Sequence, residues 1–429
     1  MLKLKRYFFT KKYFFFFIIS LFPFSNPSQA SSTAVNLEDA LSAAIKKSET
    51  ISSQEELIIQ AESHYKQALS AVLPSVTALA TYSHLARSPN DLNPRSQPLL
   101  KINLTQPLFR GFQELAMIEQ KKILKKAQEK SKKLAIKLLF QDVLQNYFLI
   151  LSLEKELLNM ANELRNYDKR IRELSYRVKI GRSRQTEILS MQSSVANTKA
   201  QMAQIEGSLK IAREIFHFLT AYPSDQSLVK ENLIVKLGPV ESYLEHIQTR
   251  PEIQAALLKV SAASENSKAV ERAVYPTLDF IGNYYAYREG VLKNTPWDVS
   301  ISLTAPLYDG GLLRSKISES HSQAKQASLA LEQVQRSAEQ EIRSLHQTVQ
   351  SDLLRVQELS NRRDLAEKNM KMLHKEYLVG LASNMEVLQA MSEHDAAIRS
   401  LDNVKISGYR DYMGLTVAAE QNEILNGTH

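Results

Sequence analysis

The sequence contains no cysteine, and this absence excludes several kinds of protein. Disulfide bonds, thiolate metal sites, a cysteine nucleophile and a lipidated amino-terminal cysteine are all ruled out. An exported protein of this composition has to be held together by packing and assembly. Glycine is also scarce, at 12 of 429 residues, which argues against a porin built wholly of strands.

Sequence motifs for catalysis are missing as well. There is no HExxH, no phosphate-binding glycine loop and no GxSxG. The nine histidines are scattered without a convincing pair at metal-ligand spacing, and His374 and His394 are expected on the surface. We therefore predict no catalytic residue, no metal site and no cofactor, and a protein that is not an enzyme.

Residues 1–30 have the pattern of a secretory signal peptide. Five basic residues and no acid precede a short run rich in phenylalanine, and Ser28 and Ala30 are small residues suited to a cleavage site. The apolar core of this segment is too short to span a membrane. We therefore exclude residues 1–30 from the fold.

Removing the signal changes the charge of the chain. The whole sequence has 54 basic and 46 acidic residues. Without the five basic residues of the signal, 49 basic residues remain against 46 acidic ones. A nucleic-acid partner is not expected, because such proteins concentrate positive charge on the folded domain. No later stretch reaches the roughly 20 apolar residues of a membrane helix, so a membrane-embedded chain would have to cross as a β-barrel.

Two motifs occur twice at one spacing. Residues 102–113 and 301–312 are identical at six of twelve positions, with an offset of 199. Residues 180–189 and 379–388 are related by the same offset. The mature chain is therefore predicted to be two copies of one unit.

The two structural repeats are assigned to residues 31–238 and 239–420, followed by a tail at 421–429. Each repeat reads as a helix, two strands, a long helix, a turn and a returning helix. The first helix is expected at 37–71, the long helices at 112–179 and 311–379, and the strands at 75–86, 99–106, 277–287 and 297–305.

The strands alternate apolar and polar residues. Apolar residues alternate with polar ones at Trp297, Val299, Ile301 and Leu303. This pattern is typical of a strand with one apolar and one polar face. Four strands of this length could span a membrane but cannot close a barrel, and an open edge in lipid leaves backbone groups unpaired. Several chains would have to pool strands: two chains give a filled barrel of eight, three a wider one of twelve. The alternative is a soluble hairpin platform packed on the helices.

Strand-end and turn motifs resemble those of the TolC-like outer-membrane efflux proteins. The motifs are Pro107-Leu108-Phe109-Arg110-Gly111, Pro306-Leu307-Tyr308-Asp309-Gly310, and the turns containing Gly181 and Gly380. Their order and spacing cover nearly all of the mature chain. The resemblance implies a mainly α fold with a β-barrel portion: a homotrimer with a 12-stranded barrel in outer-membrane lipid and a long α-helical barrel in the periplasm.

The resemblance also implies a function and partners. The chain would be a passive exit duct that docks to a periplasmic adaptor protein and an inner-membrane transporter. In this interpretation Gly181, Gly380 and Leu381 form the periplasmic tips where the adaptor docks. Pro107, Gly111, Pro306 and Gly310 mark the strand-to-helix junctions.

Glu187 and Glu386 stand six residues after the two tip glycines, where the family tends to carry an acid near the entrance. Three copies of each would form a ring of negative charge that favours cations. Arg182 and Arg184 are candidate partners of Glu187. Ala382 departs from the family, because some members have a basic residue there. The simpler interpretation is that each glutamate only complements a helix N-terminus.

A second function stays open at this point. A non-channel periplasmic coiled-coil spacer or adaptor would also need long helical hairpins. Adaptors usually add glycine-rich lipoyl-like and small barrel domains, and no such segment is found in the sequence.

Overall fold

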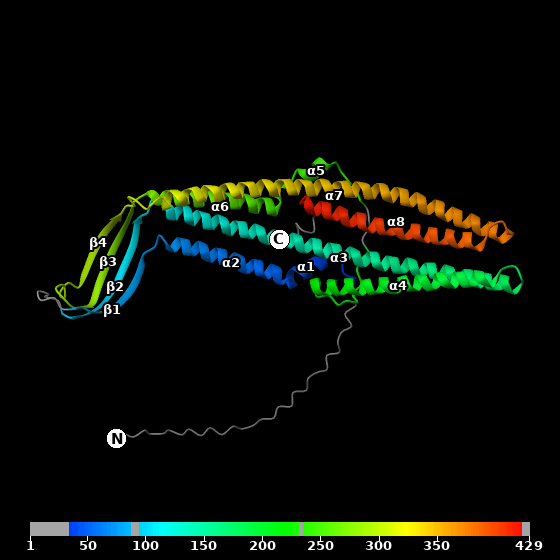
Figure 1. Ribbon diagram of the computed structural model, residues 1–429, viewed down its shortest axis with the longest axis horizontal. Coiled ribbons are helices and arrows are strands. Elements are labelled where there is room, and N and C mark those ends of the chain that lie inside the picture. Colours follow the sequence, from blue (N-terminus) through cyan, green and yellow to red (C-terminus); the bar gives the residue numbers. More distant parts are fainter. Residues whose placement is uncertain (1–33, 87–93, 231–234, 423–429) are drawn as a thin grey trace, which may run out of the picture.

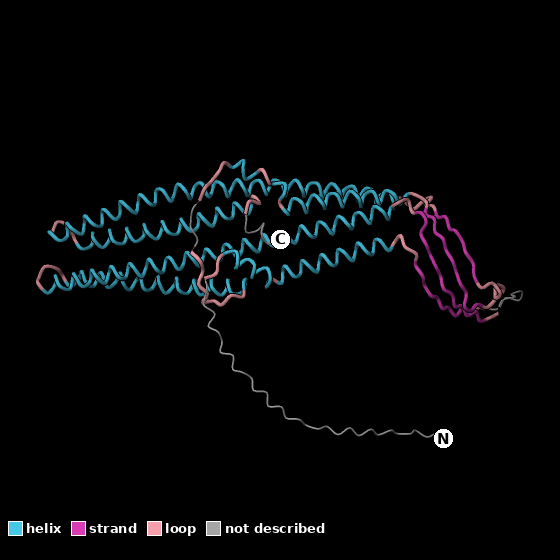
Figure 2. The backbone as a smooth tube through the Cα atoms, turned by 180° about the vertical axis from the view of Figure 1, so that it is seen from behind, coloured by secondary structure: helices cyan, strands magenta, loops and turns pink. Residues whose placement is uncertain are grey.

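The computed structural model describes residues 34–86, 94–230 and 235–422, so the predicted signal peptide at 1–30 lies outside the described residues. This part of the chain is long and narrow, with a small sheet at one end and helices running away from it (Figure 1). Figure 2 shows the same division from behind, with all strands at one end. The fold is mainly helical with one small antiparallel sheet.

Two short 3₁₀ segments apart, the described part of the chain contains helices and strands in the following order. They are α1 (Leu37–Lys47), α2 (Glu49–Ser70), β1 (Ser75–His84), β2 (Ser96–Phe109), α3 (Gln113–Lys179), α4 (Gln185–Thr220), α5 (Val240–Leu244), α6 (Pro251–Glu271), β3 (Thr277–Arg288), β4 (Trp297–Thr304), α7 (Leu312–Val379) and α8 (Asn384–Ala418).

The two long helices set the length of the molecule. Helices α3 and α7 have 67 and 68 residues, which corresponds to about 100 Å each. Near the sheet, α2 packs on α3, and α6 packs on both α3 and α7. At the other end α4 returns along α3 and α8 returns along α7, which leaves two hairpin tips far from the sheet (Figure 1).

The single helix expected at 37–71 is instead two helices separated at Ser48. The ψ angle of this residue is extended, at 116°. Its N–H donates to the Ala44 carbonyl and so closes α1, while its hydroxyl accepts from the Ile51 N–H and so opens α2. A serine that can cap a helix start favours this break over a continuous helix.

The sheet has the strand order β1-β2-β3-β4, and every neighbouring pair is antiparallel. The central pair, β2 and β3, joins the two halves of the chain, and β1 and β4 are the edges. Strand β2 is longer than the predicted 99–106, because Pro107 remains paired with Asp279 before a register shift. Four strands do not close within one chain.

The two faces of the sheet differ in polarity, as the alternation predicts. On one face the apolar side chains of β4, such as Val299 and Ile301, are exposed. On the other, Asn283 accepts from Lys101 and donates to Asp298, with heavy-atom distances of 3.0 and 2.9 Å. The alternative of a platform packed on the helices is wrong, because the sheet extends past the helix ends and its apolar face is uncovered (Figure 1).

The largest core lies halfway along the helices, where α1, α3 and α4 meet. Phe140, Tyr147, Phe148 and Phe216 are buried in it together with Leu41. The Tyr147 hydroxyl donates within 3.1 Å of the Val35 carbonyl and 2.8 Å of the Val229 carbonyl. These two bonds attach the segments around Val35 and Val229 to α3.

One described helix, α3, contains a window that is apolar and long enough to cross a membrane by length and composition. The expectation that no such stretch follows the signal is therefore wrong. Half of that window is buried inside the chain, where α3 supplies Phe140, Tyr147 and Phe148 to the core. Packing in the core accounts for that part of its apolar character.

The two strand-to-helix junctions reach similar backbone conformations in different surroundings. Gly111 and Gly310 have φ angles of +65° and +67°. A Cβ on Gly111 would lie 2.6 Å from the Arg272 carbonyl oxygen, whereas a Cβ on Gly310 would meet nothing within 4 Å. Pro306 follows the end of β4, whereas Pro107 lies within β2. The first junction therefore needs glycine for space as well as for conformation.

This difference predicts unequal costs for the same substitution. Gly310→Ala should lower the free energy of unfolding by about 1 kcal/mol through backbone strain alone. Gly111→Ala should lower it by about 3 kcal/mol, because the strain is joined by a clash. Denaturant unfolding of the two variants tests this, and equal costs would contradict the close approach at Gly111.

Candidate functional site at the helical tips

Both tips are turns closed by a glycine in the left-handed region. Gly181 has φ +70° and Gly380 has φ +84°. In the first tip the Arg182 N–H donates to the Arg177 carbonyl, and in the second the Leu381 N–H donates to the Glu376 carbonyl. No atom lies within 4 Å of a Cβ added at either glycine. Backbone conformation, not space, is therefore what selects glycine here.

Apolar side chains project from both tips. Leu381 is 81% exposed, and Val379 and Ile180 are also exposed. These three apolar side chains lie at the far ends of the long helices and are largely open to solvent. Such exposure is typical of a surface that meets another protein.

The carboxylate of Glu386 is bound to the start of its own helix. Its Oε2 accepts from the Ser383 N–H at 2.6 Å and from the Ser383 hydroxyl at 2.8 Å, while that hydroxyl accepts from the Glu386 N–H. This reciprocal arrangement is a capping box. The bonds to the Ser383 backbone and hydroxyl lower the pKa of Glu386 below its ordinary value.

Glu187 makes a different set of contacts. Its Oε2 accepts from the Ser183 hydroxyl at 2.7 Å and from the Tyr377 hydroxyl at 3.0 Å. The helix cap at this tip is Arg184, which makes no side-chain capping bond. Glu187 is therefore free to reach α7 of the other hairpin. No ion pair of Glu187 with Arg182 or Arg184 is found in the described part of the chain.

Tyr377 is the centre of the contacts between the two hairpins. Its side chain is 6% exposed, and its ring lies under the guanidinium groups of Arg170 and Arg177, with 4.1 and 4.6 Å from the central carbon to the ring centre. Burial raises the pKa of Tyr377. Arg170 Nη2 also donates to Asn384 Oδ1 at 2.9 Å. Together with Glu187 of α4, these side chains tie α3, α4, α7 and α8 together.

The sequence motifs identify Glu187 and Glu386 but miss Tyr377 and Arg170. Tyr377 precedes the tip glycine by three residues. The sequence around it gives no sign of a hydrogen-bond partner 190 residues away. The capping box has a readable signature, Ser383-x-x-Glu386. Among the described residues, no three His, Asp or Glu side chains are placed to hold a metal ion.

Comparison with known proteins identifies relatives along most of the chain. The model of the family described as outer membrane efflux protein matches residues 40–219 and 243–418. Nodulation protein T of Rhizobium leguminosarum bv. viciae is 24% identical over 295 residues, which cover 62% of this chain and 61% of that protein. The chain thus spans about three fifths of this relative. Outer membrane efflux protein BepC of Brucella suis biovar 1 (strain 1330) is 23% identical over 387 residues, 83% of this chain and 82% of BepC.

A solved structure shares the fold. The outer membrane protein VceC of Vibrio cholerae superimposes with a TM-score of 0.78 at 18% sequence identity, and the alignment covers 91% of this chain and 95% of VceC. The arrangement of long helices and a small sheet is therefore one seen before.

The hydrogen bond between the hairpins should be measurable as a coupling. Tyr377→Phe and Glu187→Ala should each destabilise the protein, and the double variant should cost about 1 kcal/mol less than the sum, because either single change removes the same bond. Unfolding midpoints of the four proteins give the coupling. Tyr176→Phe, at an exposed site on α3, is the matched control and should show no coupling with Glu187→Ala. If the costs of the Tyr377 and Glu187 variants were strictly additive, the hydrogen bond between the two side chains would contribute nothing to stability.

Proposed function

The chain belongs to the outer membrane efflux protein family, and from this premise we propose that it is the passive exit duct of a tripartite efflux or secretion system. It is an outer-membrane protein with a large periplasmic helical portion. In this proposal it forms a homotrimer, docks to a periplasmic adaptor and receives its cargo from an inner-membrane transporter.

The open sheet supports the trimer. Edge strands β1 and β4 have no further neighbour in the chain's described sheet, and unpaired backbone groups in lipid cost several kcal/mol each. Pairing β4 of one chain with β1 of the next satisfies both edges. Three chains give twelve strands and a barrel with an open interior.

The two faces of the sheet support a water-filled barrel. The face with Val299 and Ile301 would lie against lipid, and the face with Lys101, Asn283 and Asp298 would line the lumen. Trp297 and Tyr284 are paired in register at the strand end and would lie at the membrane–water interface. A soluble spacer would have no use for such a face.

The tips support docking and gating. Leu381 and Val379 offer exposed apolar side chains for contact with an adaptor. In a trimer, three copies of Glu187 and of Glu386 would surround the entrance. Glu386 stays ionised at mildly acidic pH, because its bonds to Ser383 lower its pKa.

One mass measurement tests the assembly. Protein extracted from outer membranes in mild detergent should contain three chains per particle by light scattering after subtraction of the detergent. One chain per particle, or recovery of the protein from the soluble periplasm, would mean that the strands are not pooled. The spacer or adaptor interpretation would then replace the duct.

The glutamate ring predicts block by polyvalent cations. In planar bilayers, Glu386→Gln should weaken the block by a trivalent cation about tenfold, because three negative charges leave the entrance. In the wild type, block should persist at pH 5, since the pKa of Glu386 is lowered. Glu393→Gln, at an exposed position of the same helix, is the control. Equal block in both variants would exclude Glu386 from the ring.

A further inference from the structure

Polar bonds run along the contact between α3 and α8, which belong to different hairpins. Ser152 pairs with Asn403 at 3.0 Å, Asn159 with Asp402 at 2.8 Å, and Glu163 with Arg399. We call this row of contacts, together with Arg170–Asn384 nearer the tips, the α3–α8 seam. One hairpin consists of α3 and α4, and the other of α7 and α8. Between helices α2 and α6 near the sheet and the tips at the other end, this seam is the main direct contact between the two hairpins.

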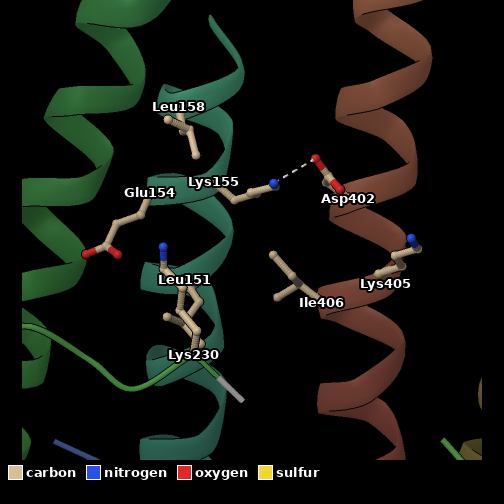
Figure 3. Close-up of a pocket in the computed structure, with 8 residues that line it drawn as sticks. All are labelled: Leu151, Glu154, Lys155, Leu158, Lys230, Asp402, Lys405 and Ile406. Atoms are coloured by element: carbon tan, nitrogen blue, oxygen red, sulfur yellow. Dashed lines mark ion pairs between the residues drawn. The ribbon is translucent and has the colours of Figure 1, made fainter. Parts of the chain in front are cut away.

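The seam is not tightly packed. A cavity of about 290 Å³ opens in it, lined among others by Leu151, Leu158 and Ile406. In Figure 3, Lys155 of α3 and Asp402 of α8 point toward each other across this space, with 3.5 Å between Nζ and Oδ2. Walls that face a void lose dispersion contacts. The polar bonds therefore add to the adhesion that the buried side chains of Leu151 and Ile406 provide at this level.

A buried cluster lies next along the seam, toward the tips. The carboxylate of Glu163, a residue 5% exposed, accepts from Tyr167 and Thr198 at 3.0 and 3.1 Å and from Arg399. These partners come from α3, α4 and α8. The buried side chain of Glu163 thus has three bonded partners.

Asp395 is a second buried acid beside Glu163, and it has far fewer partners. It is 8% exposed. Burial, and then the charge of Glu163, raise its pKa to about 6. His394 Nδ1 lies 3.4 Å from Asp395 Oδ1 but has no partner in hydrogen-bonding geometry in the described chain. His394, expected on the surface, is half-buried.

The other charged groups around Asp395 are accounted for by element. From α3 come Glu163 and the neutral Tyr167, and from α8 come His394 and Arg399, which is bound to Glu163. From α7, Glu367 lies within electrostatic reach of His394 and is paired with Lys371. Arg399 is thus bound to Glu163 and acts on Asp395 only through its charge.

We propose that the α3–α8 seam is a proton-operated latch: with Asp395 neutral the two hairpins stay together, and ionisation of Asp395 beside Glu163 drives them apart. The latch rests on the proposed function in one respect, because separation of the hairpins would widen the entrance of the duct. The separation itself does not depend on that function.

The direction follows from the raised pKa. The closed seam holds the Asp395 proton up to about pH 6, whereas a water-exposed aspartate loses it near pH 4. The closed state therefore binds more protons in that window, and its advantage falls as pH rises. From the two pKa values, the ratio of open to closed hairpins should increase about tenfold between pH 5 and pH 7.5.

A distance measurement between the hairpins tests the latch. Because the chain has no cysteine, Leu189→Cys on α4 and Met385→Cys on α8 place two spin labels at exposed positions near the tips. Labelled chain is diluted with unlabelled chain so that each particle holds one pair. The wild-type background should show the tenfold shift in the populations of short and long distances.

Asp395→Asn should hold the short distance at both pH values, with a change below about twofold. Asp364→Asn, an exposed acid on α7, should titrate like the wild type. A wild-type distance independent of pH would overturn the latch, as would an Asp395→Asn protein that still shifts tenfold. The pH dependence of the wild-type distance tests the latch even if the Asp395→Asn protein fails to fold.

Conductance at the same two pH values separates the latch from the duct. A pH-dependent distance together with a pH-dependent conductance supports both. A pH-dependent distance in a protein that forms no channel would keep the latch and remove the proposed function. A channel whose hairpins do not move with pH would keep the function and remove the latch.

Discussion

The unpaired edges of β1 and β4 are the constraint on which the rest of the molecule depends. Antiparallel pairing satisfies the backbone of β2 and β3 on both sides, but each outer strand has only one neighbour in the sheet. In water such an edge can be tolerated, whereas in lipid it cannot. The chain belongs to the outer membrane efflux protein family, and a sheet that lies in lipid, as proposed, would need partners outside its own chain. The exposed apolar side chains of β4 also need an apolar surface to pack against, because nothing in the described structure covers them.

The helices outside the membrane would take part in the same assembly. In the proposed trimer, the long helices of three chains would also come together, so α3 and α7 would need only moderate packing within one chain. This agrees with the distribution of buried side chains. Helix α7 has few buried residues for its 68 positions, among them Ile342 and Val349, while α3 buries a dense group around Phe140 and Tyr147. A helix so lightly buried is suited to contacts with a neighbouring chain.

Much of this architecture is readable from the sequence, because it rests on local patterns. Alternation in residues 297–304 marks β4 and its two faces, and the absence of proline marks α3 and α7. The break at Ser48 is harder to predict, since a serine inside a favourable helical pattern caps only if the backbone turns there. The bond from Tyr377 to Glu187 could not be predicted, because it depends on how two hairpins distant in sequence lie against each other. The burial of Asp395 is hidden for the same reason.

The two tips show how one repeated motif comes to do two different things. The second tip has serine at the helix cap, Ser383, and its hydroxyl and N–H take up the carboxylate of Glu386. In the first tip the serine stands one position earlier, at Ser183, and the cap is Arg184. Without a capping hydroxyl, Glu187 cannot form the same box, and its carboxylate turns to Ser183 and to Tyr377 of the other hairpin. A shift of serine by one residue thus separates a glutamate that stabilises its own helix from one that joins two hairpins. The contact between the hairpins near the tips is therefore made by side chains, a buried apolar cluster together with these hydrogen bonds, and not by the backbone of either tip.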